Sequence, residues 1–371
     1  MTTMPHTILS ERARLALRPD IQAMQAYPVQ DAAGMVKLDA MENPYRLTPQ
    51  LQQQLGQRLG AVALNRYPGA SVEALRRALA LQARIPQGFG LMMGNGSDEL
   101  IALLAMACAR PGACVLAPVP GFVMYRMSAQ LEGLGFVGVP LDAQFELDRT
   151  AMLDAMARHR PAIVYLAYPN NPTANLWDDA VIDEIIAAAP GLVVVDEAYQ
   201  PFASRTFMGR IAQHPHVLLM RTMSKFGLAG VRIGYLVGAQ PLIAEIDKLR
   251  APYNISVLNA ECALFALEHG DVFAAQARDI VAQRSALLES LAALAGLRAF
   301  ASEANMVLIR LESGSALGER AADTVFARMR ARGVLVKNVS AMHPLLANCL
   351  RLTVGTEEEN RAMLAALKES L

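Results

Sequence analysis

The chain has 371 residues, and 53% of them are hydrophobic, which is enough to build a large core and excludes a disordered protein. Lysine and arginine together number 34, and aspartate and glutamate also number 34. The balanced charge gives no overall field that would attract nucleic acid or a membrane surface, so any bound anion must be held by local geometry.

The four cysteines predict neither disulfides nor a metal site. They form no C-x-x-C pair and have no metal-type spacing with histidine, so we expect buried free thiols in a reducing cytoplasm and no bound metal. The first fifteen residues lack the apolar core of a signal peptide, and runs such as 101–109 are too short to cross a bilayer. These features predict a soluble, cytoplasmic protein without a membrane partner.

The N-terminal part of the chain predicts an arm followed by helices. Residues 1–35 carry few periodic signals and are expected to dock on the body or on a partner. Residues 36–44 predict a short strand that ends in a turn. Residues 49–64 predict a helix, and the proline and glycine within residues 66–69 terminate it. Ser71 is then expected to cap an amphipathic helix that runs to Ala83.

A glycine-containing turn, G-N-G-S-D-E at residues 94–99, leads directly into a predicted helix over 100–109. The free N–H groups and the dipole of a helix start bind anions, so Ser97 and Asp98 are candidates for a phosphate site. Ser97 as a plain N-cap fits this stretch equally well, and the turn alone does not decide.

Five further apolar runs predict strands, at residues 114–118, 136–140, 163–167, 192–195 and 217–220. They are continuous rather than alternating, and helical segments lie between them, which is typical of a parallel sheet covered on both faces. Polar clusters follow the last three runs: Y-P-N-N-P-T-A, D-E-A-Y, and the segment from Thr222 to Gly234. Open α/β sheets bind ligands at this edge, so we expect the clusters to converge on one site.

The C-terminal part predicts a smaller α+β domain. Residues 259–268 and 272–294 are expected to be helices, and the second is long enough to link two domains. Strands are expected at 305–311, 334–336 and 350–354, with a closing helix from Glu357. We therefore predict an arm at 1–35, a large domain at 36–260 and a small domain at 261–371.

Lys225 is the candidate nucleophile. It lies among small residues, two hydroxyls and glycines, with Arg232 seven positions later. A lysine is nucleophilic when its amine is neutral, and burial near other cations favours that state. Thr222, Ser224 and Arg232 suit a bound phosphate, and an amine beside a phosphate site is what pyridoxal phosphate (PLP) requires. Taken alone, the segment fits a surface lysine in a glycine-containing loop better, so the other clusters decide.

The other polar residues could supply the remaining contacts of a PLP site. Asp196 could pair with the pyridine nitrogen, while Asn171 and Tyr199 could bind the ring oxygen. Phe122 could stack on the ring, and nearby Tyr125 could be either a core aromatic or a ring contact. Each also has a structural alternative: Asp196 as a strand-end acid or metal ligand, Asn171 as a turn former, and Tyr199 as a packing residue.

The order of these segments resembles the fold-type I PLP-dependent aminotransferases of classes I and II. The resemblance rests on N-P-T-A at 171–174, D-E-A-Y at 196–199 and S-K-F-G-L-A-G-V-R-I-G at 224–234. Within that family, four further segments resemble histidinol-phosphate aminotransferases: L-D-A-M-E-N-P at 38–44, N-R-Y-P-G at 65–69, G-S-D-E at 96–99 and L-R-L-T-V-G-T at 350–356. The resemblance implies a large α/β domain with a mostly parallel seven-stranded sheet between helices, plus a smaller α+β domain.

The resemblance also implies an activity. The expected reaction transfers the amino group of L-histidinol phosphate to 2-oxoglutarate, giving imidazole-acetol phosphate and L-glutamate in histidine biosynthesis. The enzyme would be a homodimer with shared active sites, in which Tyr67 reaches the cofactor phosphate of the neighbouring subunit. Arg351 and Lys337 would bind the substrate anion, and Tyr27 would close over the substrate.

Four positions depart from the usual pattern of that family. Ala174 stands where the family usually has glycine. Phe122, Met41 and Lys337 stand where it often has tyrosine, asparagine and arginine, respectively. Lys337 keeps the charge but cannot bind phosphate through two parallel bonds. Two alternatives therefore stay open: an aminotransferase for aromatic or other amino acids, and a PLP lyase of the threonine-phosphate decarboxylase type. A PLP-binding regulator is not expected, because the arm leaves no room for a DNA-binding domain.

Overall fold

The computed structural model of the chain describes residues 10–24, 30–312 and 321–371. The chain divides into two compact units, Met1–Ala33 and Gly34–Leu371. In the first unit, the described residues form two short helices without buried residues, α1 (Glu11–Ala16) and α2 (Pro19–Ala23). Tyr27 lies outside the described residues.

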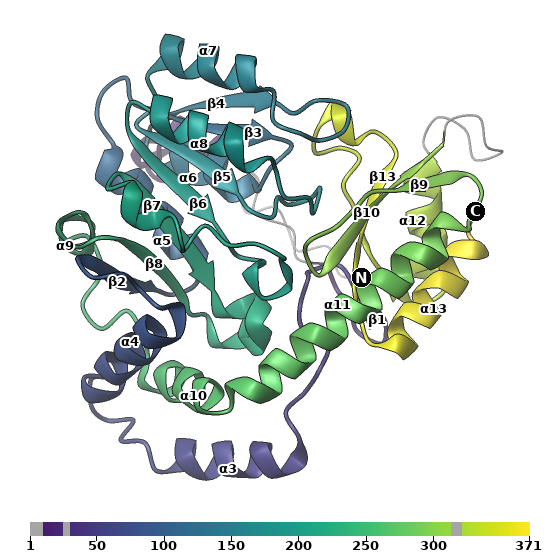
Figure 1. Ribbon diagram of the computed structural model, residues 1–371, viewed down its shortest axis with the longest axis horizontal. Helices are drawn as coiled ribbons and strands as arrows, with labels where there is room; N and C mark the ends of the chain where they lie inside the picture. Colours follow the sequence, from purple (N-terminus) through teal and green to yellow (C-terminus); the bar gives the residue numbers. More distant parts are fainter. Residues whose placement is uncertain (1–9, 25–29, 313–320) are drawn as a thin grey trace. The chain divides into compact units, whose positions relative to one another are not determined.

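A seven-stranded sheet forms the centre of the second unit (Figure 1). Its strand order is β2-β8-β7-β6-β5-β3-β4. The strands are β2 (Phe89–Gly94), β3 (Cys114–Val119), β4 (Gly135–Pro140), β5 (Ile163–Ala167), β6 (Leu192–Asp196), β7 (Val217–Thr222) and β8 (Gly234–Ala239). Strands β3 to β7 pair in parallel, whereas β8 is antiparallel to both of its neighbours. The predicted mostly parallel seven-stranded sheet is therefore confirmed.

Helices cover both faces of this sheet, and alternate residues of each strand face different helices. On one face, Val164 and Leu166 of β5 share a core with side chains of α4, α7, α8 and α10. On the other face, Ile163 and Tyr165 pack with α5, α6 and α9. These helices are α4 (Ala70–Ala83), α5 (Ser97–Cys108), α6 (Val123–Leu131), α7 (Arg149–His159), α8 (Asp179–Ala188), α9 (Gln240–Asp247) and α10 (Val257–Glu268). Burial on both faces explains why the strand sequences are apolar throughout.

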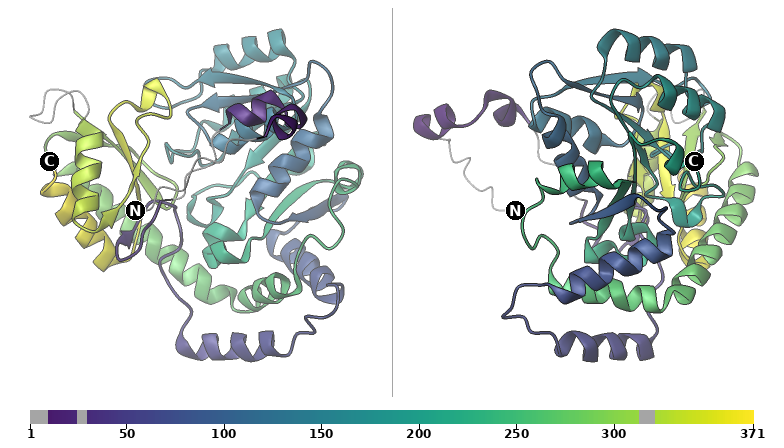
Figure 2. Two further views of the ribbon diagram at one scale, coloured as in Figure 1. Left: turned by 180° about the vertical axis from the view of Figure 1, so that it is seen from behind. Right: turned by 60° about the vertical axis from the view of Figure 1, so that its left-hand side comes forward.

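The C-terminal part builds a second, antiparallel sheet with the order β12-β13-β10-β9 (Figures 1 and 2). Its strands are β9 (Leu297–Ala299), β10 (Met306–Leu311), β12 (Lys337–Asn338) and β13 (Cys349–Thr353). The helices of this part are α11 (Gly270–Ala292), α12 (Ala321–Ala331) and α13 (Glu357–Lys368). A capping box between Thr356 and Glu359 starts α13. Most side chains of this sheet pack with α11, α12 and α13 in a core of their own, whereas Leu308 of β10 and Cys349 of β13 join the core of the seven-stranded sheet.

Residues close to the start of the second unit join the C-terminal part. Strand β1 (Val36–Lys37) pairs in parallel with β11 (Val334–Leu335), and Leu38 and Met41 lie in the C-terminal core. The expected large domain at 36–260 includes these residues, whereas the structure joins them to the C-terminal part. The remaining domain boundaries stay predictions.

Two helix limits also differ from the expectation. Helix α3 (Pro49–Gly60) ends at Gly60 instead of reaching residue 64, in keeping with the low helix propensity of glycine. Helix α4 starts at Ala70 with Gly69 in the N-cap position, so the predicted cap at Ser71 is wrong. Short helical turns complete the unit: η1 (Gln200–Phe202), η2 (Ile211–Gln213), η3 (Ser224–Leu228), η4 (Ala229–Val231) and η5 (Pro344–Leu346). Within the described ranges, every helix is too short or too polar to cross a bilayer.

Candidate active site

A cavity of about 370 Å³ lies at the carboxyl ends of β5, β6 and β7. The predicted cofactor residues line it, with the exception of Tyr67: Ser97, Asp98, Phe122, Asn171, Asp196, Tyr199, Thr222, Ser224, Lys225 and Arg232. The three polar clusters that follow the parallel strands therefore meet in one cavity, as their positions predict.

A second cavity of about 420 Å³ lies beside it and shares Thr222. It is bounded by α4, α11 and β7, and the buried charged groups in its wall, Glu197 and Arg221, pair with each other at 2.7 Å. The smaller cavity is the better candidate for chemistry, because it contains the lysine and the buried acid.

Lys225 lies in the turn η3 directly after β7, which brings its amine to the sheet edge. Its Nζ donates a hydrogen bond to the carbonyl oxygen of Ala40 at 2.9 Å. Burial, followed by the positive charge of Arg351, lowers the pKa of Lys225 to about 7, while the carboxylate of Glu42 acts in the opposite direction. Much of the amine is therefore neutral near neutral pH, as a nucleophile or a base requires.

Asp196 is the last residue of β6, and only 4% of it is exposed. Its Oδ2 accepts a hydrogen bond from the Tyr125 hydroxyl at 2.6 Å, and its Oδ1 accepts one from the N–H of Ala198 at 3.0 Å. Burial raises the pKa of Asp196 to about 6, although the bond from Tyr125 opposes the rise. Both donors are neutral, so a cationic ring nitrogen in the cavity would complete the environment of this carboxylate.

Tyr125 also lines the cavity. Besides its bond to Asp196, it stacks on Tyr165 with ring centroids 4.2 Å apart, and it meets the edge of Phe122. A buried tyrosine hydroxyl usually has a hydrogen-bond partner, so a tyrosine in a buried segment indicates a polar group, such as a carboxylate, close to it. The sequence left Tyr125 open between core and ring contact, and its role at Asp196 depends on a tertiary contact.

A cradle for an anion forms where α5 begins. Arg232 donates from Nη2 to Oδ2 of Asp98 at 3.0 Å, so Asp98 faces the guanidinium. A Cβ atom on Gly96 would meet Arg232 Nη2 at 2.6 Å, and one on Gly234 would meet the backbone of Gly96 at 2.7 Å. The two glycines thus allow the helix start, the arginine and the strand β8 to approach one another closely. This arrangement suits a phosphate group.

The hydroxyls of Thr222 and Ser224 complete this side of the cavity. Thr222 Oγ1 and Ser224 Oγ lie 3.0 Å apart, and the N–H of Ser224 donates to Thr222 Oγ1 at 3.1 Å. Both residues are buried and line the cavity. Together with Arg232, they provide the short hydrogen bonds and the positive charge that a phosphate ester requires.

Arg351 joins the C-terminal sheet to the cavity. It lies on β13, where its Nη1 donates to Oδ1 of Asn171 at 2.6 Å and its Nη2 to the carbonyl oxygen of Asp39 at 2.8 Å. Lys337 is directly opposite Arg351 in the pairing of β12 with β13. Burial and the charge of Arg351 lower the pKa of Lys337. Two neighbouring cations, one of them bonded to the cavity-lining Asn171, suit a substrate anion.

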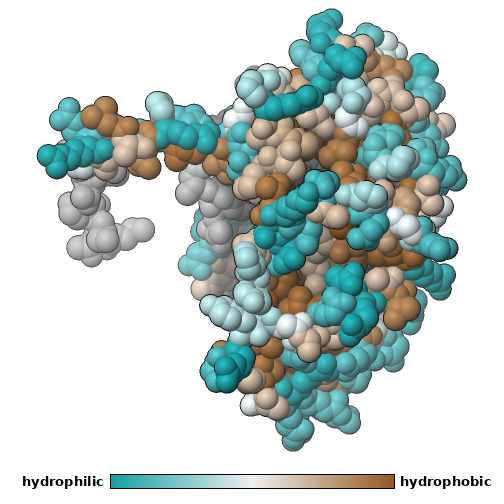
Figure 3. All heavy atoms as spheres, turned by 90° about the vertical axis from the view of Figure 1, so that its left-hand side faces the viewer, coloured by the Kyte–Doolittle hydropathy of each residue, from teal (hydrophilic) through white to brown (hydrophobic). Residues whose placement is uncertain are grey.

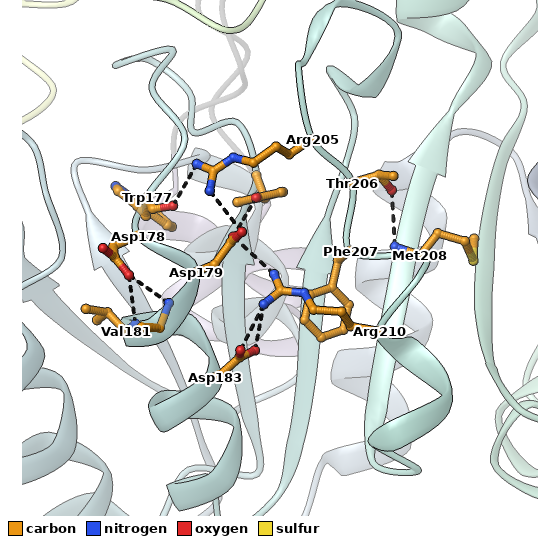
Figure 4. A network of polar contacts seen from close by, with 12 residues as sticks. Trp177, Asp178, Asp179, Val181, Asp183, Arg205, Thr206, Phe207, Met208 and Arg210 are labelled. Carbon is orange, nitrogen blue, oxygen red and sulfur yellow. Dashed lines mark hydrogen bonds and ion pairs between the residues drawn. The ribbon is translucent and has the colours of Figure 1, made fainter.

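Charged networks hold the loops that carry these residues. The hydroxyl of Tyr168 donates to Oδ1 of Asp179 at 2.7 Å, just before the loop that contains Asn171. Arg205 and Arg210 both pair with Asp179, and Arg210 also binds Asp183 (Figure 4). The network connects the chain after β5 with the segment after β6.

Two of the departures from the family pattern have backbones in the left-handed region. Met41 has φ 51° and Ala174 has φ 65°. The carbonyl of Met41 accepts a bond from Asn305 Nδ2 at 3.0 Å, and that of Ala174 accepts one from the N–H of Glu303 at 2.7 Å. Asparagine and glycine, the usual residues there, tolerate this conformation better than methionine and alanine.

Tyr67 lies away from the cavity lining. It is 80% exposed, and its ring stacks on that of Tyr253 with centroids 4.5 Å apart and an interplanar angle of 15°. The single chain therefore does not bring Tyr67 to the other predicted cofactor residues.

Comparison with known proteins agrees with this geometry. The family model described as "Aminotransferase class I and II" matches residues 33–367. The chain is 64% identical to a histidinol-phosphate aminotransferase of Polaromonas naphthalenivorans over the full length of both chains. It is 63% identical to one of Methylibium petroleiphilum, covering 97% of this chain and 96% of the relative.

Solved structures share the fold. The histidinol-phosphate aminotransferase of Sinorhizobium meliloti in complex with pyridoxal-5'-phosphate has a TM-score of 0.83 at 25% identity and covers 95% of this chain and 97% of its own. An L-threonine-O-3-phosphate decarboxylase of Porphyromonas gingivalis has a TM-score of 0.75 at 20% identity and covers 90% of this chain and 99% of its own, a similarity of fold alone.

Proposed function

The chain belongs to the class I and II aminotransferases, and we propose that it transfers the amino group of L-histidinol phosphate to 2-oxoglutarate. The observation that carries this proposal is the cavity in which a lysine of lowered pKa, a buried acid and an arginine-containing anion cradle meet. The relatives at 60–64% identity that are named for this activity support the choice of substrate.

Pyridoxal phosphate is the cofactor of this enzyme, and the cavity residues fit it. When bound, it supplies an aldehyde that bonds to amines and a ring that accepts electrons from the substrate's Cα. Asp196 would hold the ring nitrogen, and Asn171 and Tyr199 the ring oxygen. Phe122 would cover the ring face. The phosphate would lie in the cradle formed by Ser97, Thr222, Ser224 and Arg232, where Asp98 orients the arginine.

Lys225 would attach the cofactor and then move protons. Once free, its amine would lie beside the substrate's Cα. Because the pKa of Lys225 is lowered to about 7, the free amine would accept the proton from the substrate's Cα and could later act as the proton donor. Asp196 would keep the ring nitrogen protonated throughout, which makes it the main electrostatic contributor.

Arg351 and Lys337 would bind the anionic end of each substrate. In one half-reaction this is the phosphate of histidinol phosphate, and in the other it is a carboxylate of 2-oxoglutarate or glutamate. Arg351 bonds to Asn171, which lines the cavity, and Lys337 lies opposite Arg351 on the adjacent strand, so the two cations share one face of the sheet, which supports this assignment.

We also propose a homodimer in which Tyr67 binds the cofactor phosphate of the other subunit. Its exposure of 80% supports a role outside its own subunit. Hydrophobic side chains lie among hydrophilic ones on the face drawn in Figure 3.

The four cysteines are free thiols, which supports a cytoplasmic location.

A spectral titration of the purified protein tests the proposal. Histidinol phosphate should convert the absorbance of the bound cofactor to that of its amine form, and 2-oxoglutarate should restore it. Conversion by phenylalanine alone would move the assignment to an aromatic aminotransferase. Release of CO₂ without an oxo-acid would indicate a lyase, and an absence of cofactor absorbance after adding PLP would refute the central claim.

A further inference from the structure

Two tyrosines form an exposed stacked pair that the catalytic cavity does not use. Tyr67 is 80% exposed and Tyr253 is 57% exposed, yet their rings lie almost parallel with centroids 4.5 Å apart. Large aromatic side chains usually bury most of their surface, so such a pair on the outside of a subunit requires an explanation.

The backbone of Tyr253 is strained. Its φ is 57°, in the left-handed region that an aromatic residue rarely adopts and where glycine would fit without cost. Strained non-glycine residues that persist in a fold are typical of functional sites. The strain therefore favours a function for the Tyr253 ring rather than for the turn alone.

Hydrogen bonds fix the turn that carries Tyr253. The next residue, Asn254, donates from Nδ2 to Oε2 of Glu99 at 2.8 Å and to the carbonyl oxygen of Met93 at 3.3 Å. The same Glu99 oxygen accepts the N–H of Asn95 at 2.6 Å. Residues 93–99 include the turn and helix start of the anion cradle. The turn that carries Tyr253 is thus bonded to the segment that forms the subunit's own cradle.

The segment that carries Tyr67 is held less firmly. It follows α3, which lies beside α10 (Figure 1) and is fixed to it through Arg58, bound to Glu261 and Glu268 at 2.7 Å. After α3, residues 65–69 form neither helix nor strand. The stacked ring of Tyr253 therefore limits the directions that the exposed Tyr67 side chain can take.

We propose that Tyr253 is a positioning residue, which holds the Tyr67 ring at the orientation in which its hydroxyl reaches the cofactor phosphate of a second copy of the chain. This inference rests on the proposed function, in which the dimer shares its active sites. Tyr253 acts through Tyr67 and not by touching substrate. A preset ring loses less side-chain freedom on binding the phosphate, so its hydroxyl binds more tightly.

The test measures the dissociation constant of PLP for the wild type and for Tyr253→Ala, Tyr253→Phe, Tyr67→Phe and the double variant Tyr67→Phe/Tyr253→Ala. Tyr253→Ala should weaken PLP binding about threefold to tenfold, the factor expected for losing one aromatic pair. Tyr253→Phe keeps the stack and should bind PLP as the wild type does. Once Tyr67→Phe has removed the hydroxyl, Tyr253→Ala should have little further effect. Leu81→Ala, which truncates a side chain that is 80% exposed on α4, is the matched control.

Sedimentation velocity on the same proteins separates a failure of the shared-site dimer from a failure of the role assigned to Tyr253. The wild type and all variants should be dimers. A wild type that binds PLP as a monomer, or does not bind it, would overturn both the shared-site proposal and this inference. A dimeric wild type whose Tyr253→Ala variant binds PLP normally would overturn the inference alone. So would additive losses in the double variant, or a Tyr253→Ala effect confined to the substrate KM.

Discussion

Arg351 Nη1 donates a hydrogen bond of 2.6 Å to Oδ1 of Asn171, a residue 180 positions earlier in the chain. The bond connects strand β13 of the C-terminal sheet with the loop after β5 of the central sheet. Arg351 is assigned to the substrate anion and Asn171 to the cofactor's ring oxygen. The bond therefore joins the two ends of the proposed site, and an incoming anion would share the guanidinium with Asn171.

Replacing Arg351 by glutamine should weaken the binding of both substrates. A charged hydrogen bond contributes about 1.5–3 kcal/mol, so the KM values for histidinol phosphate and for 2-oxoglutarate should each rise about tenfold to a hundredfold. Steady-state kinetics with each substrate varied in turn measures this. If only one of the two KM values changed, the two anions would not use the same arginine.

Lys337→Arg tests the departure that bears on substrate choice. An arginine can form two parallel bonds to a phosphate, whereas the ammonium of Lys337 forms single bonds, so we expect the KM for histidinol phosphate to fall about threefold. Lys337→Met should raise it about tenfold or more. Lys337→Arg keeps the positive charge at this position, and Lys337→Met removes it. An unchanged KM in both would place the phosphate away from Lys337.

The covalent attachment of PLP should depend on pH through Lys225. The pKa of Lys225 is lowered to about 7, so the neutral, reactive amine increases as the pH rises through 7. The attachment rate, followed by absorbance in stopped-flow mixing of cofactor-free protein with PLP, should rise to a plateau above about pH 8. Lys225→Ala should lose the covalent complex and nearly all turnover. A rate that kept rising to pH 10 would contradict the lowered pKa.

Asp196→Asn should stabilise the cofactor-free protein while weakening cofactor binding. The pKa of Asp196 is raised from 3.8 to about 6, so between these values the folded state holds a proton that the unfolded state has lost. Its contribution to the unfolding free energy therefore falls as the pH rises through this window. At pH 8 the variant should gain about 3 kcal/mol in urea unfolding, and the gain should shrink at pH 4.5. If the variant instead had a lower unfolding free energy at pH 8, the negative charge of Asp196 would be compensated in the folded protein.

The sequence predicts the central sheet and most of the cavity because both depend on local order. Continuous apolar runs indicate buried parallel strands, and the residues after them necessarily reach one edge. Lys225, Asp196 and Asn171 are found in this way. Ser97 and Arg232 come together because a glycine turn opens a helix beside β8.

Contacts between distant segments could not be predicted from the sequence. Neither the bond from Tyr125 to Asp196 nor that from Lys225 to the Ala40 carbonyl leaves a local pattern. The pairing of β1 with β11 is of the same kind, since two residues are too few to show a period. Tyr67 illustrates a different limit, because its proposed partner belongs to a second copy of the chain.

Glu197 forms a buried ion pair with Arg221 whose loss should be costly. It is 1% exposed, and its Oε2 accepts bonds from Arg221 Nε at 2.9 Å and Nη2 at 2.7 Å. Arg221→Met would leave this carboxylate without its cation, so the unfolding free energy should fall by about 3–5 kcal/mol. Arg361→Ala breaks the exposed pair with Glu357 and should cost less than about 0.5 kcal/mol. Urea unfolding of both variants at pH 7 measures the difference. Equal losses would mean that water, rather than Arg221, compensates Glu197.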